Sequence, residues 1–267
     1  MTESSSPKLL IVVPTLDSYK LLPRLLSSLQ QQTCPDWRLL FIDGPSGPEH
    51  RRWLHDCCCA EARCHWVEQD LDRPGIFGAM NQGFAHASPE DWLMFWGSDD
   101  WAAAPHAFAV AISAIEAVDR KLDLLVCQGR YADAVTQVLG RHSRFKRACL
   151  LNGTSYRRTL WYGSTPPHQA TLFGPGARSK LANYAPGFRL SADLDYFLQI
   201  SLHTNLCVRC LDLQLVCMAD GGISGRQTKL RLQEVRRAYR RAFGWCWWFP
   251  YLTRYVRRLA SLLPACG

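Results

Sequence analysis

The chain has 267 residues, of which 48% are hydrophobic, and it carries a formal net charge of +8. This length and composition suit one large globular domain or two small ones and exclude a disordered chain. Residues 1–8 are polar, and the apolar run at 9–13 is too short for a signal-peptide core or a membrane span. We therefore expect a cytoplasmic protein.

The positive charge is concentrated at the C-terminal end of the chain. From Arg226 onward there are ten basic residues and a single acidic one, Glu234, so this segment carries +9. Because the whole chain carries +8, the remainder carries −1. This asymmetry indicates an anionic partner for the C-terminal segment.

Short apolar runs alternate with segments of helical periodicity through the first half of the chain. We expect strands at 9–13, 38–42, 65–67, 92–96 and 122–127, and helices at 21–29, 49–60, 76–87 and 102–118. This alternation predicts βαβ units and a mostly parallel sheet. Farther along, we expect a hairpin at 130–139, a basic loop at 141–147 and a helix at 191–203.

Polar residues follow each of the first four predicted strands. Right-handed crossovers place the carboxyl ends of parallel strands on one side of the sheet, where open α/β sheets bind ligands. We therefore expect these residues to converge on one crevice. They are Thr15, then Asp43, then Asp70 or Asp72, and finally Asp99 and Asp100.

The acidic pair Asp99 and Asp100 ends the apolar run at 92–96. Aspartate is a poor strand former and is seldom buried without a partner. Two carboxylates at the carboxyl end of a buried strand suit a divalent cation, which in turn neutralises a diphosphate. The alternative is a solvated turn that caps the next helix.

Five motifs together make the chain resemble the family-2 glycosyltransferases of the GT-A fold, across roughly residues 8–225. The resemblance implies an α/β GT-A domain at 7–225, with a mostly parallel sheet flanked by helices, followed by a helical extension at 226–267. The motifs are VVPT at 12–15, FIDG at 41–44, DRPGIFGAMNQG at 72–83, WGSDD at 96–100 and ADLD at 192–195.

The resemblance also implies an activity. Such a protein is an inverting, metal-dependent, hexosyltransferase-type enzyme that moves a sugar from a nucleotide-diphosphate sugar, here most simply a UDP-sugar, to a glycan hydroxyl. The acceptor would be lipid-linked or part of a lipopolysaccharide. The rival hypothesis is a non-catalytic nucleotide-sugar-binding or scaffold protein with a degenerate GT-A fold.

The family's donor-site roles map onto residues at the predicted crevice. Asp100, together with Asp99, would hold Mn²⁺ or Mg²⁺. Asp43 could instead serve the turn with Gly44, and Asn81 could be an ordinary helix-surface residue. The residues expected to contact the nucleotide-sugar are Pro14, Thr15, Asp17, Asp43, Asp72, Asn81 and Asp99.

By the same resemblance, Asp193 is the candidate catalytic base that deprotonates the acceptor hydroxyl. The alternative is a helix N-terminal residue favoured by the macrodipole. Asp195 is the second candidate for the base. His168 and Asp195 are candidates for contact with acceptor or diphosphate, and His168 could equally be structural. The loop at 221–224 resembles one that follows the last core strand in relatives.

Several positions depart from the family's pattern. Asp17 stands where many relatives have Asn, Gly78 where they often have Asp, and Ala192 where they often have Glu. These departures leave the predicted fold unchanged and leave the identity of the donor open.

The extension at 226–267 contains an arginine-rich predicted helix and an aromatic segment. Apolar residues then recur at helical spacing from Trp248 to Leu263, with Arg254, Arg257 and Arg258 largely between them on the polar side. This composition predicts an interfacial helix that holds the enzyme at an anionic membrane, peripherally on its inner face. The alternative is a helix packed on the catalytic domain. Because the body contains no recognised nucleic-acid module, we expect no nucleic-acid partner.

Overall fold

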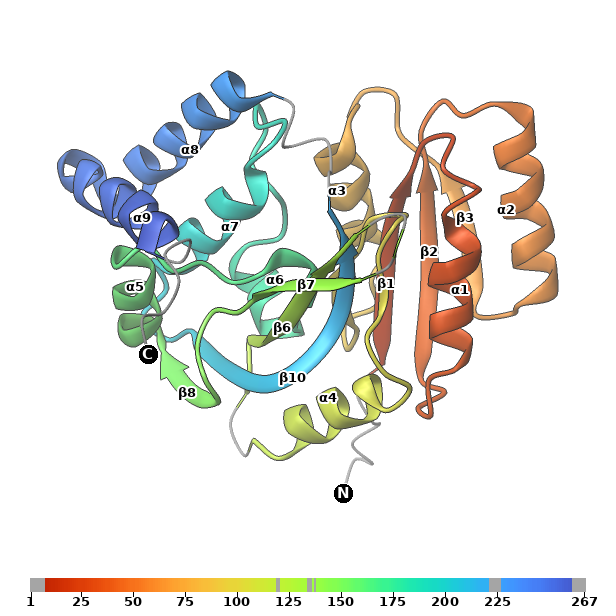
Figure 1. Cartoon of the computed structure of the whole chain (residues 1–267), viewed down its shortest axis with the longest axis horizontal. Coiled ribbons are helices and arrows are strands. Elements are labelled where there is room, and N and C mark those ends of the chain that lie inside the picture. Colours follow the sequence, from red (N-terminus) through yellow and green to blue (C-terminus); the bar gives the residue numbers. More distant parts are fainter. Residues whose placement is uncertain (1–7, 119–120, 134–135, 137, 221–226, 261–267) are drawn as a thin grey trace.

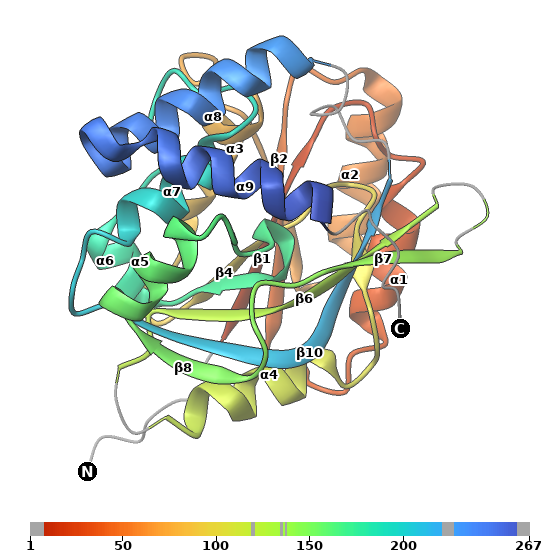
Figure 2. The ribbon, with the colours of Figure 1, turned by 60° about the vertical axis from the view of Figure 1, so that its left-hand side comes forward.

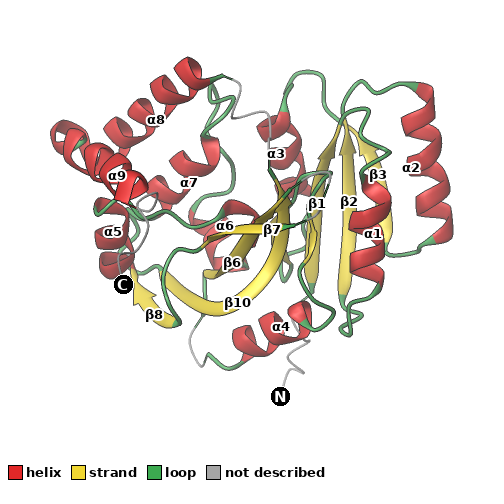
Figure 3. Ribbon diagram, in the orientation of Figure 1, coloured by secondary structure: helices red, strands yellow, loops and turns green. Residues whose placement is uncertain are grey.

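The structure is a computed structural model that describes residues 8–118, 121–133, 136, 138–220 and 227–260. A single mixed sheet runs through the molecule and carries helices on both faces (Figures 1 and 3). Its strand order is β3-β2-β1-β4-β9-β6-β10-β5, with β7 beside β6 and β8 beside β10.

The first half of the chain forms the parallel part of the sheet. β1 pairs in parallel with β2 and β4, and β2 pairs in parallel with β3. The four strands predicted here are thus confirmed. The elements are β1 (Leu9–Thr15), α1 (Leu22–Gln30), β2 (Trp37–Asp43), α2 (Pro48–Ala60), β3 (Cys64–Glu68), α3 (Ile76–His86) and β4 (Trp92–Phe95).

The second half adds mainly antiparallel pairings. β9 runs antiparallel between β4 and β6, whereas β6 and β10 are parallel to each other. The elements are β5 (Trp101–Ala102), α4 (Ala107–Glu116), β6 (Leu124–Ala132), β7 (Leu139–Ser143), β8 (Cys149–Asn152), α5 (Gly153–Trp161), η1 (His168–Ala170), β9 (Thr171–Phe173), α6 (Pro175–Lys180), α7 (Ala192–Ile200), β10 (Cys207–Ala219), α8 (Thr228–Phe243), η3 (Gly244–Cys246) and α9 (Trp248–Ala260).

Three predicted boundaries in this half are wrong. The helix expected at 102–118 begins only at Ala107, because Pro105 disfavours helical backbone before it and residues 101–102 pair with β10 instead. The basic segment at 141–147 is not all loop, since 139–143 form β7 and complete the predicted hairpin with β6. The helix expected to reach 203 ends at Ile200.

The sheet separates two apolar layers. Along β1, Leu10 and Val12 face the layer that contains α3, α7 and α8, while Leu9, Ile11 and Val13 face α1, α2 and α4. This alternation follows from the two-residue period of a strand. Because both faces are covered, the strand is apolar throughout its centre, which is why its sequence reads as one continuous run.

The C-terminal helices pack against the body of the molecule. Figure 2 shows α8 and α9 lying over α7 and α5, and Tyr239 and Phe243 of α8 join the same buried cluster as Leu10. At Gly163, an added Cβ would lie 2.5 Å from the backbone nitrogen of Arg254, so α9 approaches this loop closely. The predicted division at 225/226 and the loop at 221–224 lie outside the described residues.

Candidate donor and transfer site

The ends of the parallel strands are joined by direct hydrogen bonds. The Thr15 hydroxyl donates to Asp43 Oδ1 at 3.0 Å, linking β1 to β2. Gln69 N donates to Asp43 O at 2.7 Å, linking β2 to the segment after β3. Ser98 Oγ donates to Pro14 O at 3.3 Å, which links β4 to β1. The carboxyl ends of the four strands are therefore linked at one edge of the sheet, where the sequence predicts the crevice.

Asp43 is the most heavily engaged of these groups. Its side chain is fully buried, and Oδ1 also accepts a hydrogen bond from Ser46 at 2.6 Å. His50 Nε2 of α2 lies 3.1 Å from the same oxygen, and Arg51 Nε lies 3.4 Å from Oδ2. The carboxylate thus joins β1, β2 and α2, and its predicted contact with a nucleotide base stays a prediction.

The exposed residues around this edge are held by local turns. Asp17 has a φ of +46°, and its Oδ1 accepts a hydrogen bond from Gly47 N at 2.7 Å. Asp72 is exposed, and its backbone nitrogen donates to Asp70 Oδ1 at 3.0 Å. At Gly78 an added Cβ would lie 1.8 Å from the Arg73 carbonyl oxygen. A side chain such as the family's frequent Asp therefore does not fit at Gly78 with the backbone of residues 73–78 in this conformation.

Asp99 and Asp100 converge on Gly97. A Cβ built at Gly97 would lie 2.7 Å from Asp99 Oδ1 and 3.4 Å from Asp100 Oδ2, so both carboxylates face the space that the glycine leaves. Asp100 is buried, and its Oδ2 accepts a hydrogen bond from Gly97 N at 2.6 Å. The two carboxylates are therefore held together directly after β4, the strand at which the parallel part of the sheet meets the antiparallel β9.

The electrostatics of this pair favour a cation. Burial raises the pKa of Asp100 well above its usual value, and the charge of Asp99 adds to the rise, although the Gly97 hydrogen bond opposes it. Burial also raises the pKa of Asp99. In the part of the chain that the structure describes, no basic side chain forms an ion pair with either carboxylate.

The donor set fits Mg²⁺ or Mn²⁺ better than a structural metal. Among the described residues, no group of three or more His, Cys, Asp or Glu side chains is arranged to hold a metal ion. Mg²⁺ is typically held by one or two carboxylates, with substrate phosphates and water as the remaining ligands. Asp99 and Asp100 meet that description.

Asn81 on α3 is not directed at open space. Its Nδ2 donates to Tyr184 O at 3.1 Å, and its Oδ1 accepts from Tyr184 N at 2.7 Å. Both ends of the amide thus bind the backbone of one residue, Tyr184, in the segment between α6 and α7. In this structure the side chain holds that segment, and its contact with the nucleotide-sugar stays a prediction.

His168 lies between β4, the strand that leads to Asp99 and Asp100, and α7, the helix that carries the candidate base. Its ring stacks on Phe95 of β4 with centroids 5.7 Å apart, and its Nε2 lies 2.7 Å from the Tyr184 hydroxyl. Burial lowers the pKa of His168, and the charge of Asp193 opposes that shift. Burial and the charges of Tyr196 and Asp193 raise the pKa of Tyr184. His168 and Tyr184 therefore form a hydrogen-bonded pair, and the charge of Asp193 acts on both.

The two candidate bases on α7 have different surroundings. Asp193 lies in the first turn and is half-buried. Asp195 is buried and forms an ion pair with Arg241 of α8. Burial raises the pKa of Asp195, and Arg241 opposes the shift. Asp193 is therefore the more accessible of the two carboxylates, whereas Asp195 is held by α8.

The sequence analysis missed five side chains that hold the site. His50 and Arg51 surround Asp43, and Tyr184 binds both Asn81 and His168. Glu234 and Arg241 of α8 hold α7. The sequence carries a weak signal for His50 and Arg51, because Pro48 begins α2 and residue 50 therefore lies in the first turn of that helix. The other three depend on contacts between distant segments.

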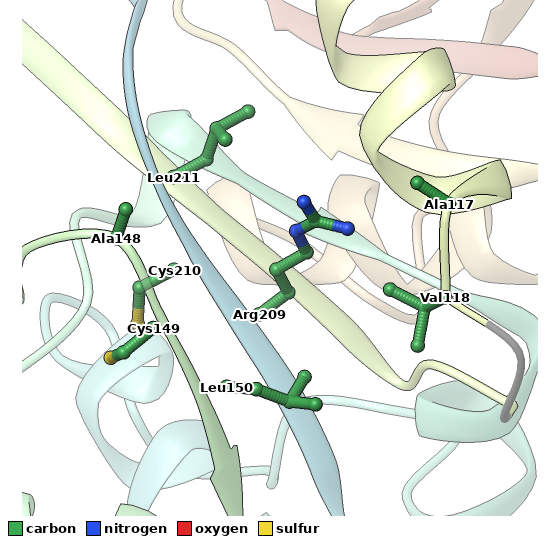
Figure 4. A pocket seen from close by; sticks show the side chains of 8 residues that line it. All are labelled: Ala117, Val118, Ala148, Cys149, Leu150, Arg209, Cys210 and Leu211. Atoms are coloured by element: carbon green, nitrogen blue, oxygen red, sulfur yellow. The ribbon is translucent and has the colours of Figure 1, made fainter.

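A cavity of about 600 Å³ lies elsewhere, between the end of α4, β8 and the start of β10 (Figure 4). Its lining is mostly apolar, and Arg209 donates to the Ala114 carbonyl at 2.8 Å. Val208 pairs with Leu124 at the beginning of β6, so the cavity is at the amino ends of these strands. It is therefore on the opposite edge of the sheet from Asp99 and Asp100.

Comparison with known proteins agrees with this geometry. The family model for Glycosyl transferase family 2 matches residues 10–182. A PGL/p-HBAD biosynthesis glycosyltransferase of Mycobacterium bovis is 25% identical over 221 residues, which cover 82% of this chain and 80% of the relative. An uncharacterized glycosyltransferase of Mycobacterium tuberculosis is 28% identical over 173 residues, 64% of this chain and 60% of the relative.

Solved structures share the fold. Residues 1–349 of TarS from S. aureus, in complex with UDP-GlcNAc, match with a TM-score of 0.67 and 16% identity, covering 88% of this chain and 67% of that one. The uncomplexed TarS 1–349 structure is matched over 64% of its length. The mannosyltransferase PcManGT from Pyrobaculum calidifontis, in complex with GDP-Man and Mn²⁺, matches with a TM-score of 0.63, 13% identity and coverage of 99% and 77%.

The family match and the named relatives, together with the shared fold, identify the class of the protein as a glycosyltransferase. Within that class, the chain belongs to glycosyl transferase family 2. The family and the fold class predicted from the sequence are thereby confirmed.

Proposed function

We propose that the chain is an inverting, metal-dependent, hexosyltransferase-type enzyme that uses a nucleotide-diphosphate sugar as donor. The observation that carries the proposal is the convergence of Asp99 and Asp100 on Gly97, directly after the central strand β4 and without a basic partner among the described residues. Asp100 and Asp99 would hold Mn²⁺ or Mg²⁺. When bound, the cation supplies positive charge that stabilises the departing diphosphate.

A UDP-sugar is the donor we propose first. The TarS fragment of similar fold has been described with UDP-GlcNAc, and PcManGT with GDP-Man and Mn²⁺. Both support a nucleotide-sugar here. Pro14, Thr15 and Asp17 at the end of β1, and Asp43 at the end of β2, line the edge where the nucleotide would lie.

The transfer step is assigned to Asp193. Its carboxylate accepts the proton of an acceptor hydroxyl while the hydroxyl oxygen attacks the anomeric carbon and the bond to the diphosphate breaks. A single displacement of this kind inverts the anomeric configuration. The charge of Asp193 acts on His168, which stacks on Phe95 of β4, the strand that leads to the acidic pair, and this link between the two regions supports the assignment.

For the acceptor we propose a lipid-linked or lipopolysaccharide glycan at the inner face of an anionic membrane. In the described part of the chain, no helix is long and apolar enough to cross a membrane. Helix α9 nevertheless exposes an apolar strip, formed by Trp248 at 51%, Leu252 at 52% and Val256 at 65% exposure. These positions are four residues apart and share one helix face. Trp245 beside them is 85% exposed.

The opposite face of α9 packs on the protein. Arg254 is buried and donates to Thr165 Oγ1 at 3.0 Å, while Thr253 donates to Trp161 O at 3.0 Å. The expectation that Arg254 faces a membrane is therefore wrong, because its guanidinium serves as a packing contact. Leu259 and Leu263 of the predicted pattern cannot be assigned to a face, since their side chains lie outside the described residues. The packed-helix and anchor hypotheses each fit one face of α9.

A vesicle assay tests the membrane part. We expect the full chain to sediment with vesicles of phosphatidylcholine and phosphatidylglycerol at low salt, and to be released by high salt, because surface charge attraction is screened. The double variant Trp248→Ser/Leu252→Ser should lose this binding. Leu150→Ser, which removes another exposed apolar side chain, is the control. Equal binding by all three proteins would contradict a role for the strip.

A donor screen tests the catalytic part. Thermal shift with Mn²⁺ and a panel of UDP-, GDP- and dTDP-sugars should reveal at least one donor, because a ligand that binds the native state raises its stability by mass action. Release of the nucleotide diphosphate from that donor then separates the enzyme from the rival scaffold hypothesis. Metal-dependent binding with no release under any acceptor condition would favour the scaffold.

A further inference from the structure

The first turn of α7, which carries Asp193, is held by a carboxylate from the C-terminal extension. Glu234 of α8 is buried, with 5% of its surface exposed. Its Oε1 accepts a hydrogen bond from Arg189 N at 2.7 Å, and its Oε2 accepts from Leu190 N and Ser191 N at 2.8 and 2.9 Å. Three consecutive backbone N–H groups directly before α7 therefore donate hydrogen bonds to one side chain.

No local side-chain cap accompanies this contact. Ser191 is the N-cap residue of α7, and its side chain makes no capping hydrogen bond. A helix N-terminus leaves several backbone N–H groups without helical partners, and an anion there is favoured by the helix dipole. Glu234 supplies such an anion at the entry to α7 from a position 43 residues away from Ser191.

A second contact from α8 holds the other side of the same turn. Arg241 donates to Asp195 Oδ2, and Asp195 is 1% exposed. Between Glu234 and Arg241, Arg237 Nη1 donates to Gly187 O at 3.0 Å and the Arg237 guanidinium stacks on Phe188. One face of α8 therefore holds residues 187–195 at three successive points.

From these contacts we propose that Glu234 and Arg241 are positioning residues for the transfer step. They hold the first turn of α7, and with it the carboxylate of Asp193, in place relative to His168 and Tyr184. The proposal rests on the proposed role of Asp193 as base. It gives the C-terminal extension a role in catalysis that is separate from any membrane contact.

The contacts with charged groups justify the expected size of the effect. Hydrogen bonds to a charged group are stronger than neutral ones. A small displacement of a catalytic group reduces the rate, because reactive geometry has to be maintained within fractions of an ångström. Donor binding, by contrast, depends on the ends of β1, β2 and β4, which Glu234 and Arg241 do not contact.

The experiment compares Glu234→Gln with the wild-type enzyme by three measurements. Amide hydrogen exchange at residues 189–191 should accelerate roughly 10- to 100-fold, the range that corresponds to losing hydrogen bonds to a charged group. The turnover number, measured as UDP release from the UDP-sugar found in the screen, should fall about tenfold or more. The Kd of UDP with Mn²⁺ should stay within about twofold, because the substitution does not alter the ends of β1, β2 and β4.

Arg241 supplies a second, independent test. Arg241→Ala alone leaves Asp195 buried without its partner and risks unfolding. The double variant Asp195→Asn/Arg241→Ala removes both charges, and we expect it to fold, to bind UDP normally and to turn over about tenfold more slowly. Arg241→Lys should restore much of the rate. Arg240→Ala is the control, because Arg240 stacks on Trp247 on the side of α8 that faces α9.

Failure of this proposal is distinguishable from failure of the proposed function. Asp193→Asn is assayed in parallel. If Asp193→Asn loses turnover while Glu234→Gln and the double variant keep it, the positioning role is wrong and the base assignment stands. If Asp193→Asn keeps full turnover, the base assignment itself is wrong. A fall in UDP affinity parallel to turnover in Glu234→Gln would also overturn positioning, since it indicates general distortion.

One practical consequence follows for membrane experiments. A chain that ends at residue 225 lacks Glu234 and Arg241 as well as α9. Its loss of activity therefore would not separate membrane attachment from positioning of α7, whereas the variants Trp248→Ser/Leu252→Ser and Glu234→Gln do separate them.

Discussion

The edge of the sheet at which we propose that the donor binds, called the donor edge, is assembled differently from helix α7. At the donor edge, Thr15, Asp43 and Ser98 are placed by the strands that they end, and they bond to one another across adjacent strands. At α7, the key contacts come from Glu234 and Arg241, on a helix near the end of the chain. The first region thus depends on sheet topology, and the second on docking of the C-terminal extension.

The two regions also differ in charge balance. Asp99 and Asp100 have no ion-pair partner in the described parts of the chain, and burial raises the pKa of each. Asp195 is also buried but is paired with Arg241. Buried carboxylates are normally paired or bound to a metal. The comparison therefore separates two acids that we propose bind a cation from an acid that fixes structure.

The largest expected effect concerns Asp100. We expect Asp100→Ala to abolish Mn²⁺-dependent donor binding and turnover while the protein remains folded, because the metal then lacks its buried carboxylate ligand. Thermal shift with and without Mn²⁺, together with UDP release, measures both quantities. Full activity in the folded variant would rule out Asp100 as the metal ligand.

The next effect concerns Asp193. Asp193→Asn should lower the rate of transfer by about 10²–10⁴-fold, the usual contribution of a positioned general base. Steady-state release of the nucleotide diphosphate measures the loss. The same change at Asp195 serves as the comparison, and a loss of less than tenfold for Asp193→Asn would move the base to Asp195 or another group.

A smaller effect is expected at Gly97. In Gly97→Ala the new Cβ would lie 2.7 Å from Asp99 Oδ1, so the two carboxylates must move apart. We expect Mn²⁺ affinity, measured by competition titration, to weaken roughly 10- to 100-fold, as for other changes around metal ligands. Gly140→Ala, whose Cβ would have its nearest contact at 3.5 Å, is the matched control and should bind Mn²⁺ normally.

The smallest effect concerns pH. Burial lowers the pKa of His168 below its ordinary 6.5, so below that pH the unfolded chain binds a proton that the folded chain does not. Stability should therefore fall as the pH drops below 6.5, by at most about 1.4 kcal/mol per pH unit for this one group. Urea unfolding at pH 7.5 and 5.5 should show a smaller loss in His168→Phe than in the wild type. An equal loss in both proteins would mean that folding does not change the protonation of His168.

What the sequence predicts well is the region built from consecutive elements. The apolar runs of β1, β2 and β4 and the polar residues after them are local signals, and the parallel topology follows from their alternation with helices. Convergence of Thr15 and Asp43 was therefore predictable. The family motifs added the likeness that the family comparison confirms.

The remainder depends on contacts that sequence patterns do not encode. Nothing about Glu234 in an arginine-rich helix indicates that it binds the backbone at 189–191. Likewise, Asn81 falls within a family motif, yet its amide binds the backbone of Tyr184. Arg254 was expected on the polar side of an interfacial helix and is buried instead, because this face of α9 packs on residues 161–165. Periodicity alone does not indicate which face of a helix packs on the protein.

The central claim is that donor binding and transfer belong to separate regions. Calorimetric titration of UDP, with and without Mn²⁺, into the wild-type protein, Asp100→Asn and Asp193→Asn tests it most directly. We predict that Mn²⁺ strengthens UDP binding equally in the wild type and Asp193→Asn, and that Asp100→Asn loses this increment. An undiminished Mn²⁺ effect in Asp100→Asn, or its loss in Asp193→Asn, would contradict the account.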